Sequence, residues 1–206
     1  MKEISILLSI AVVGSSIIFL FDRRAKRKIL LHEKLDQLLP GVTQGIVSFK
    51  ELTSLKRGYF ASYEKNEWQE ANKELYYSVK EFQDLSRWFR IEQMNQLREF
   101  SDYYSEIEER RNSFNAVLID QELKAYEQAF DNVEGNSLDD QQRKAIIVEE
   151  DNNLCIAGAG SGKTTTIVGK IKYLLERYRI DPEKILLISY TRKAAESLSE
   201  RVQNNR

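Results

Sequence analysis

Apolar residues recur every three or four positions along the middle of the chain, between residues 59 and 134. This spacing predicts helices with one apolar face, and the range contains no glycine or proline. The step from Phe89 to Met94 breaks the repeat. The pattern therefore favours either one long coiled coil with a stutter or a hairpin that folds back at the break, and it does not choose between them. The recurring residues are Leu75, Val79, Phe82, Leu85, Phe89, Met94, Leu97, Phe100, Tyr104 and Ile107.

Helix-breaking residues divide the region 29–134 further. Pro40 and Gly41, followed by Gly45, predict an early interruption, and Gly58 predicts a second one. Aromatic residues are abundant in this region and alternate with lysine and arginine. Such a mixture fits a nucleic-acid surface, but aromatic residues at helical spacing more often belong to a core.

The N-terminal segment has a different pattern. Ile4–Phe21 is an apolar run of eighteen residues without a charge. As a helix it would extend ~27 Å, close to the ~30 Å thickness of the hydrocarbon core of a bilayer. Residues 1–28 are therefore expected to form a transmembrane helix with a basic flank, in contact with membrane lipid. The basic flank consists of Arg23, Arg24, Lys26, Arg27 and Lys28.

The basic flank also predicts an orientation. Basic residues next to a membrane-spanning helix remain on the cytoplasmic side, so we expect a single pass through the inner (cytoplasmic) membrane with the rest of the chain in the cytoplasm. A cleaved signal peptide is an alternative, but it would have its basic residues before the apolar run and a small-residue cleavage site after it. A buried core helix is the other alternative, although an uncapped apolar terminus is a poor candidate for one.

A third pattern begins near residue 137. Ser137, followed three residues later by Asp140, predicts the capped start of a short helix. The apolar run Leu154–Ala157 then predicts a buried strand, and from Lys163 the spacing of apolar residues becomes helical. Between strand and helix lie Gly158, Gly160 and Gly162.

This arrangement predicts an anion site. A strand, a glycine turn and a helix N-terminus bring free backbone N–H groups and the positive end of the helix dipole to one point. Lys163 adds a mobile positive charge that reaches β and γ phosphates, and the Thr164 hydroxyl is placed to ligate Mg²⁺. The strict phosphate-loop pattern has glycine where this chain has Ala157, a difference of one residue.

A second apolar strand is expected at Glu183–Thr191, after a turn at Asp181 and Pro182, and an amphipathic helix follows it. A strand, a helix and a strand joined by a right-handed crossover form the start of a parallel sheet. The expected fold class is thus the start of an α/β P-loop domain, preceded by a long helical region and an N-terminal transmembrane helix.

The segments "LDDQQRKAI", "LCIAGAGSGKTTTI" and "ILLISYTRKAAESLSERV" together resemble the first RecA-like domain of superfamily 1 DNA helicases of the UvrD/Rep kind, and among these the helicase IV group. The resemblance covers Ser137–Val202 and extends more weakly through Phe114–Gly135. It implies that residues 135–206 are the incomplete start of a RecA-like helicase ATP-binding domain. It also implies that the chain is the N-terminal part of an ATP-dependent 3′–5′ DNA helicase. In that family an alanine opens the phosphate loop, as Ala157 does here.

The resemblance assigns the nucleotide-binding residues. Gln142 aligns with the adenine-reading glutamine of the family, whose amide both donates and accepts hydrogen bonds. Lys163 and Thr164 take the catalytic phosphate and Mg²⁺ roles, Thr164 being the metal ligand. The expected ATP-binding residues are Gln142, Ala157, Gly158, Ala159, Gly160, Ser161, Gly162, Lys163, Thr164 and Thr165.

The resemblance assigns a DNA-binding segment as well. Tyr190, Thr191 and Arg192 align with residues that contact single-stranded or partly duplex DNA, where an aromatic ring stacks on a base. The family usually has phenylalanine and asparagine at the positions of Tyr190 and Arg192.

Composition constrains the function only weakly. A net charge of −1 with 31% charged residues neither marks nor excludes a nucleic-acid-binding protein. Cys155 is the only cysteine, so no intrachain disulfide forms, and the single histidine, His32, excludes a histidine metal cluster and a Ser-His-Asp triad.

Two alternatives to a helicase stay open: a nucleotide-binding switch that unwinds nothing, and a helical membrane scaffold with a remnant ATPase domain. The acidic Mg²⁺ partner and the arginines that such an ATPase needs at the γ-phosphate have no counterpart in residues 1–206. We therefore expect this part of the protein to be inactive as an ATPase on its own.

Overall fold

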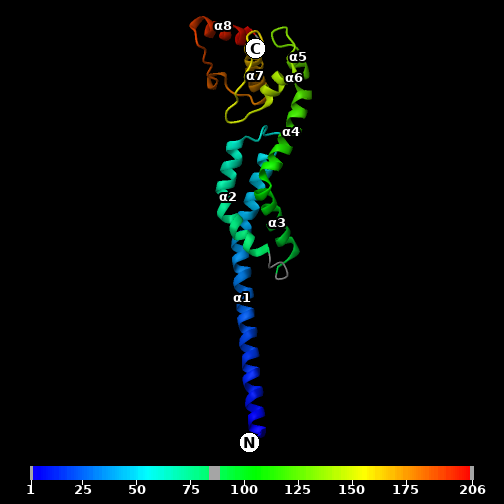
Figure 1. The fold of residues 1–206 in the computed structure, drawn as a ribbon, viewed down its shortest axis with the longest axis vertical. Helices are drawn as coiled ribbons and strands as arrows, with labels where there is room; N and C mark the ends of the chain where they lie inside the picture. Colours follow the sequence, from blue (N-terminus) through cyan, green and yellow to red (C-terminus); the bar gives the residue numbers. More distant parts are fainter. Residues whose placement is uncertain (1, 84–88, 205–206) are drawn as a thin grey trace. The chain divides into compact units, whose positions relative to one another are not determined.

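Helices dominate the structure. It is a computed structural model that describes the backbone of residues 2–83 and 89–204 and the side chains of residues 23–82 and 89–203. The helices are α1 (Lys2–Leu52), α2 (Ser62–Gln83), α3 (Ile91–Ser105), α4 (Ile107–Ala125), α5 (Glu127–Asp131), α6 (Asp140–Ile147), α7 (Lys163–Arg177) and α8 (Arg192–Asn204), with a 3-10 turn, η2 (Pro182–Lys184), before α8 (Figure 1).

The chain forms two compact units. Unit 1 comprises Met1–Lys50 and Trp68–Ile107, and unit 2 comprises Glu51–Glu67 and Glu108–Arg206. The domain ranges 1–28, 29–134 and 135–206 that we inferred from the sequence stay a prediction.

The core of unit 1 uses the periodic apolar residues. Val79 and Phe82 of α2 are buried, as are Leu97 and Phe100 of α3. Helix α2 ends at Gln83 and α3 begins at Ile91, and both helices contribute to the same core. A single long coiled coil through this range is therefore not what the chain forms. The interrupted repeat marks a change from one helix to the next.

Most aromatic rings of this region are packed together. The Phe49 and Tyr103 rings stack with their centroids 4.4 Å apart. Trp68 is buried, and its indole Nε1 donates a hydrogen bond to Ser48 Oγ at 2.9 Å. These rings stabilise unit 1 by burial rather than by facing a ligand.

Helix α1 continues through Pro40, Gly41 and Gly45, so the predicted early break is wrong. A proline inside a helix costs about 3 kcal/mol, and side-chain packing has to offset that cost. The glycines let α1 pack closely: a Cβ at Gly45 would lie 2.5 Å from Phe100 Cε2. The second predicted break is confirmed, because Gly58 lies between α1 and α2 with φ +111°.

The membrane predictions are also corrected. Among the residues that the structure describes, no helix is both long enough and apolar enough to cross a bilayer. A transmembrane helix, a membrane-lipid partner and a location in the cytoplasmic membrane are therefore not retained. The apolar run Ile4–Phe21, which suggested them, lies in the part of α1 whose side chains fall outside the described residues. From Arg23 to Lys28 the described side chains of α1 are exposed and mostly basic, and a hydrocarbon core excludes such groups.

The α/β fold class is contradicted as well, since the described residues form no β-strand. Both predicted strands, Leu154–Ala157 and Glu183–Thr191, lack strand pairing and are largely exposed. Their apolar side chains illustrate this, with Ile156 91% and Ile188 84% exposed. A strand forms only when a neighbouring segment pairs with its backbone, and no described segment does so here. The single bridge in the described residues joins Val133 and Asn136.

The core of unit 2 lies between α6 and α7. Its buried residues are Phe130, Val133, Leu138, Ile146, Ile147, Val168, Tyr173 and Leu198. Gly169 permits the close approach of the two helices, because a Cβ there would lie 2.8 Å from Ile146 Cδ1. The packing fixes the N-terminal turns of both helices next to the glycine-rich loop that connects them.

Two acidic residues before the glycine-rich loop cap the start of α2. Glu150 accepts hydrogen bonds from the Ser62 backbone N–H at 2.9 Å and from Arg111 Nη1 at 2.6 Å. Asp151 accepts one from the Tyr63 backbone N–H at 3.0 Å. Burial alone would raise the pKa of Glu150, but the hydrogen bonds from Arg111 and Ser62 outweigh burial and lower this pKa to about 2.

A second connection holds the far end of α7. Arg177 Nε donates to Glu122 Oε1 at 2.9 Å, and Arg177 Nη2 donates to the Leu55 carbonyl at 2.7 Å. Glu122 also accepts a hydrogen bond from the buried Tyr173 hydroxyl at 3.1 Å. Helix α4 and the segment after α1 are thus bonded to the helix that follows the glycine-rich loop.

The packing of α1 is tested by a matched pair of glycine substitutions. Both Gly41→Ala and Gly45→Ala gain helix propensity, worth about 1 kcal/mol. At Gly41 the nearest atom to the new Cβ is the flexible Leu75 tip at 3.3 Å, whereas at Gly45 it is the buried Phe100 ring. We expect Gly41→Ala to be neutral or stabilising and Gly45→Ala to destabilise by about 1–3 kcal/mol in urea unfolding. Equal effects would contradict the close packing.

The Glu150 network predicts a pH dependence. Because the folded-state pKa lies below the ordinary value of 4.5, the network stabilises the protein at neutral pH, and this contribution is lost as the pH falls from ~4.5 towards ~2. Glu150→Gln should lower the free energy of unfolding by about 2 kcal/mol at neutral pH, and the difference from wild type should shrink in acid. Glu127→Gln, at an exposed position, is the control. A difference that does not depend on pH would show that ionised Glu150 is not the stabilising species.

Candidate functional site

The glycine-rich loop, residues 157–164, leads directly into α7. Gly160 and Gly162 have φ values of +76° and +80°, a conformation that glycine adopts without a Cβ penalty. Gly162 is the N-cap of α7, and its carbonyl accepts the Thr166 backbone N–H at 2.9 Å. The N-terminus of a fifteen-residue helix therefore opens onto the loop, where its N–H groups and dipole favour an anion.

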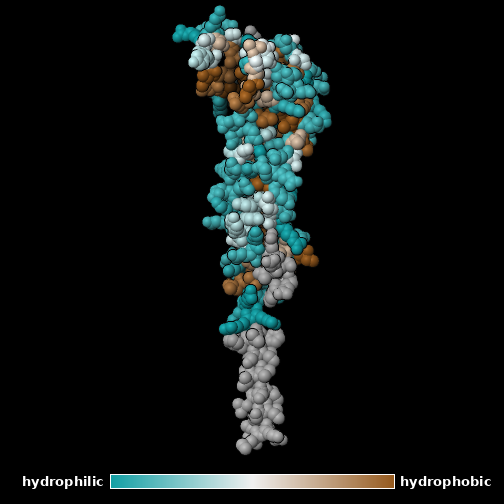
Figure 2. All heavy atoms as spheres, in the orientation of Figure 1, coloured by the Kyte–Doolittle hydropathy of each residue, from teal (hydrophilic) through white to brown (hydrophobic). Residues whose placement is uncertain are grey.

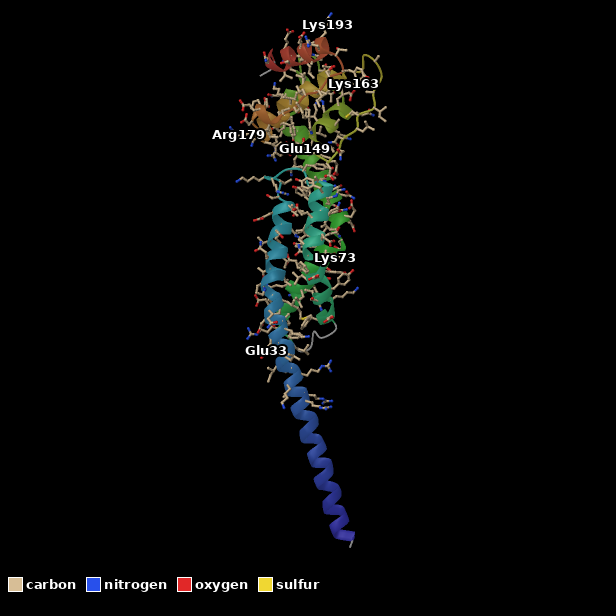
Figure 3. All side chains as sticks on the ribbon, turned by 90° about the vertical axis from the view of Figure 1, so that its left-hand side faces the viewer. Glu33, Lys73, Glu149, Lys163, Arg179 and Lys193 are labelled. Carbon is tan, nitrogen blue, oxygen red and sulfur yellow. The ribbon has the colours of Figure 1, made fainter. Side chains whose placement is uncertain are left out.

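Lys163 is folded back onto the loop (Figure 3). Its Nζ donates to the Ala157 carbonyl at 2.8 Å and to the Gly158 carbonyl at 2.6 Å. The Ser161 hydroxyl donates to the same Gly158 carbonyl at 2.8 Å. These two neutral carbonyls hold the Lys163 ammonium against the loop. A phosphate, being charged, is a stronger partner for that ammonium than a carbonyl.

Helix α6 reaches the loop through Gln142. Its Oε1 accepts the Asp139 backbone N–H at 2.9 Å, and its Nε2 donates to the Ser161 carbonyl at 3.0 Å. Asp139 Oδ1 in turn accepts the Gln142 backbone N–H at 2.8 Å, which completes a capping box. The helix is thus capped by Asp139 with Gln142, not by Ser137 with Asp140 as the sequence suggested.

A pocket of about 390 Å³ lies between α6, the loop and the start of α7. Its lining consists of Asp139, Gln141, Gln142, Ala145, Cys155, Ile156, Ala157, Ser161, Lys163, Thr166 and Ile167. The predicted nucleotide-binding residues in this lining are Gln142, Ala157, Ser161 and Lys163. The volume lies within the ~300–1,000 Å³ of small-molecule sites in proteins.

Several lining residues were not predicted from the sequence. Cys155 and Ile156 were expected to be buried in a strand, but both are exposed at the pocket. Gln141 and Ala145 lie on α6 with Gln142. Ala145 comes three positions after Gln142, so the two share a helix face, and this spacing could have identified Ala145 as a lining residue. The lining is apolar on several sides and polar near the loop.

The remaining predicted loop residues do not line the pocket. Gly158, Ala159 and Gly160 are exposed on the loop. Thr164 is exposed in the first turn of α7. The Thr165 hydroxyl accepts a hydrogen bond from Arg201 Nη2 at 3.2 Å, so it faces α8.

Lys170 connects α6 to α7 behind the pocket. Its Nζ donates to the carbonyls of Ile146 at 2.5 Å and Val148 at 3.0 Å, and it pairs with Glu149. Burial lowers the pKa of this ammonium, while Glu149 opposes the shift. The cation caps the C-terminal end of α6 and holds it against α7.

Residues 138–206 match the UvrD/REP helicase N-terminal domain. The resemblance to this family that we described from the sequence is confirmed. The UvrD/REP match includes α6, the glycine-rich loop, α7 and α8, and so contains the whole pocket.

Individual UvrD/REP-type relatives support the match. The chain is 36% identical to DNA helicase IV of Escherichia coli over 118 residues, which cover 55% of this chain and 17% of that protein. It is 49% identical over 65 residues to a probable DNA helicase II homolog of Mycoplasma capricolum, covering 32% of this chain and 9% of that protein. It is 41% identical over 68 residues to the ATP-dependent DNA helicase PcrA of Staphylococcus aureus, covering 33% of this chain and 9% of that protein.

The aligned part of the chain thus spans less than a fifth of each of these relatives. The helicase IV alignment is longer than the UvrD/REP match, so it extends upstream of Leu138 into the helical region. No solved structure matches the chain significantly.

The predicted DNA-binding segment lies at the start of α8 in the UvrD/REP region. Tyr190 is fully exposed. The Thr191 hydroxyl accepts the Ala194 backbone N–H at 3.2 Å and so caps α8, and Arg192 is the first residue of that helix. None of the three residues lines the pocket. Figure 2 shows hydrophobic side chains gathered on the surface over the extended segment that precedes them, which contains the exposed residues Leu186 and Ile188.

Proposed function

We propose that residues 138–206 bind ATP with Mg²⁺ in the pocket between α6 and the glycine-rich loop. We further propose that they do so as the nucleotide-binding part of an ATP-dependent 3′–5′ DNA helicase. One observation carries the proposal: Gln142, the glycine-rich loop and Lys163 surround a single cavity, in a segment that matches the UvrD/REP helicase N-terminal domain.

The loop supplies the phosphate-binding groups. Backbone N–H groups at the start of α7 and the helix dipole favour negative charge at the end of the pocket that Lys163 lines. Lys163 leaves the carbonyls of Ala157 and Gly158 for the β and γ phosphates when the nucleotide enters. The exchange replaces neutral acceptors by charged ones and makes the ammonium a phosphate ligand.

Thr164 is the proposed protein ligand of Mg²⁺. No group of three metal-ligating side chains occurs among the described residues. Mg²⁺ keeps several waters and binds through one or two protein oxygens together with phosphate oxygens. When bound, the ion neutralises charge on the β and γ phosphates. The exposed Thr164 hydroxyl stands next to Lys163 in the first turn of α7.

The other end of the pocket suits a base. Ala145, Ile156 and Ile167 provide apolar walls, and the Gln142 amide lies at the edge of the pocket. In the free site that amide bonds to Asp139 and Ser161, so reading adenine requires it to exchange at least one of these partners. Binding of the base would in this way release the Ser161 carbonyl and alter the loop.

The DNA contact is assigned to Tyr190, Thr191 and Arg192. An exposed aromatic ring offers a stacking surface to a base, and stacking contributes about 1–3 kcal/mol per base. A cation in the first residue of the following helix can contact the phosphate backbone. Single-stranded or partly duplex DNA is the proposed partner.

Lys163→Ala tests nucleotide binding. Removing the ammonium should weaken binding of a fluorescent ATP analogue with Mg²⁺ by about 10- to 100-fold, since a charged partner of the phosphates is lost. Lys172→Ala, on the same helix and outside the pocket lining, should bind like wild type. The single cysteine provides a second measurement, because ATP with Mg²⁺ should slow alkylation of the pocket residue Cys155 in wild type but not in Lys163→Ala. Unchanged affinity together with unchanged protection would contradict the site.

Gln142→Ala tests base recognition. The substitution removes both the base contact and the bond to Ser161, so the affinity for ATP and for GTP should fall, and that for ATP should fall further. The ratio of the ATP affinity to the GTP affinity, measured by competition, separates the role of Gln142 in reading the base from its role in supporting the loop. Gln141→Ala, at the adjacent pocket residue, is the matched control. An equal loss for ATP and GTP would show that Gln142 supports the loop without reading adenine.

A further inference from the structure

Arg201 bonds the C-terminal part of α8 to two other elements of unit 2. Arg201 Nε donates to Glu134 Oε1 at 2.7 Å, and Nη2 donates to the other carboxylate oxygen of Glu134. The same Nη2 donates to the Thr165 hydroxyl at 3.2 Å. One guanidinium thus joins α8, the turn at Glu134 and the first turn of α7. The planar guanidinium presents its donors in a rigid fork that matches the two oxygens of a carboxylate.

The turn that carries Glu134 is tightly constrained. Glu134 and Gly135 both have positive φ values, +56° and +78°. The Val133 N–H donates to the Asn136 carbonyl at 2.9 Å, and the Asn136 N–H donates to the Val133 carbonyl at 3.0 Å. A glutamate in a left-handed conformation is strained and persists only where the surroundings impose it. Here Val133 is fixed in the core, and the ion pair with Arg201 holds the glutamate side chain.

Helix α8 connects this ion pair to the proposed DNA-binding segment. The helix begins at Arg192, directly after Tyr190 and Thr191, and extends for thirteen residues, about 20 Å. Leu198 anchors its middle in the core. The segment before it is exposed and unpaired with any described strand. A displacement of the first turn of α8 therefore moves Arg201 at the opposite end, because a helix transmits motion as a rigid rod.

Arg201 bonds to the helix turn that carries Lys163 and Thr164. Thr165 directly follows Thr164 and lies two residues after Lys163, so its placement fixes the first turn of α7. That turn supplies the N–H groups that face the loop. A shift of Arg201 alters the hydrogen bond to Thr165 and with it the orientation of this turn.

We infer that the Glu134–Arg201–Thr165 contact couples single-stranded DNA at Tyr190–Arg192 to nucleotide affinity in the pocket, with Arg201 as a positioning residue. The inference rests on the proposed function, since both ligands belong to it. By thermodynamic linkage, DNA changes the nucleotide affinity by the same factor by which the nucleotide changes the DNA affinity.

The test measures the affinity of the purified 206-residue chain for a fluorescent ADP analogue with Mg²⁺, with and without a saturating oligothymidylate. In wild type the two affinities should differ by a factor of about 5 to 150, the usual range of coupling between sites. In Arg201→Met the ratio of the two affinities should fall to within about twofold of one, because DNA no longer acts on α7 through the bond to Thr165. A purely structural role of Arg201 would lower both affinities and leave the factor unchanged.

A second variant and a control complete the test. Glu134→Gln keeps the size of the side chain and removes the charge, so it should lose the coupling as Arg201→Met does, and the double variant should lose no more than either single one. Arg179→Met, which removes an exposed cation elsewhere in unit 2, should keep wild-type coupling.

The outcomes separate the coupling from the site itself. A wild-type chain that binds the nucleotide with the same affinity with or without DNA overturns the coupling and leaves the nucleotide site standing. Wild-type coupling in Arg201→Met overturns the role of this residue. A wild-type chain that does not bind the nucleotide overturns the proposed function and the coupling together.

Discussion

The close approach of α6 and α7 at Gly169 is the constraint on which the candidate site depends. No side chain fits between the two helices there, because a Cβ would meet the buried Ile146. Because protein interiors are close-packed, any added side-chain volume there would displace the neighbouring helix. Since helices are rigid over a few turns, fixing them at Gly169 also fixes Gln142 and Lys163, which stand at their N-terminal ends. The pocket is the space that remains between those two ends.

The helical region contributes directly to the unit that holds this pocket. Glu150, just before the glycine-rich loop, is bonded to Ser62 and Arg111. Arg177, at the end of α7, is bonded to Glu122 and to the Leu55 carbonyl. These contacts hold the stretch that contains the loop at both of its ends. The alignment with helicase IV, which also extends upstream of the UvrD/REP match, includes part of this helical region.

The Lys163 and Gln142 contacts at the loop are hydrogen bonds to backbone carbonyls. Lys163 Nζ donates to the Ala157 and Gly158 carbonyls, and Gln142 Nε2 donates to the Ser161 carbonyl. Each is a neutral partner that a charged phosphate or a base edge can replace with little structural change. Arg201 differs, because its carboxylate partner Glu134 is charged and is held by a constrained turn. That contact is suited to transmitting a displacement, whereas the contacts of Lys163 and Gln142 are suited to exchange.

Much of the site could be predicted from the sequence because its signals are local. The positive φ values of Gly160 and Gly162 and the helix that begins at Lys163 follow from residues close together in the chain, whereas Gln142 was assigned by the resemblance to the UvrD/Rep family. Local spacing likewise predicted the buried face of α3, at Leu97 and Phe100. Short-range geometry determines such features, and the sequence displays it.

Only the tertiary structure decided features that depend on distant partners. Pro40 stays inside α1 because side-chain packing outweighs the energetic cost of a proline within a helix, and only this cost can be recognised from the sequence. The apolar run Leu154–Ala157 is no strand, because a strand exists only where another segment pairs with it. The bond of Arg201 to Glu134 joins residues 67 positions apart, and no local pattern predicts it. The sequence by itself determined the turn and the helix of the candidate anion site, since each needs only its own neighbours. Long-range packing decided which segments lie around that site. Contacts between distant residues depend on the whole fold, so the local sequence does not show them.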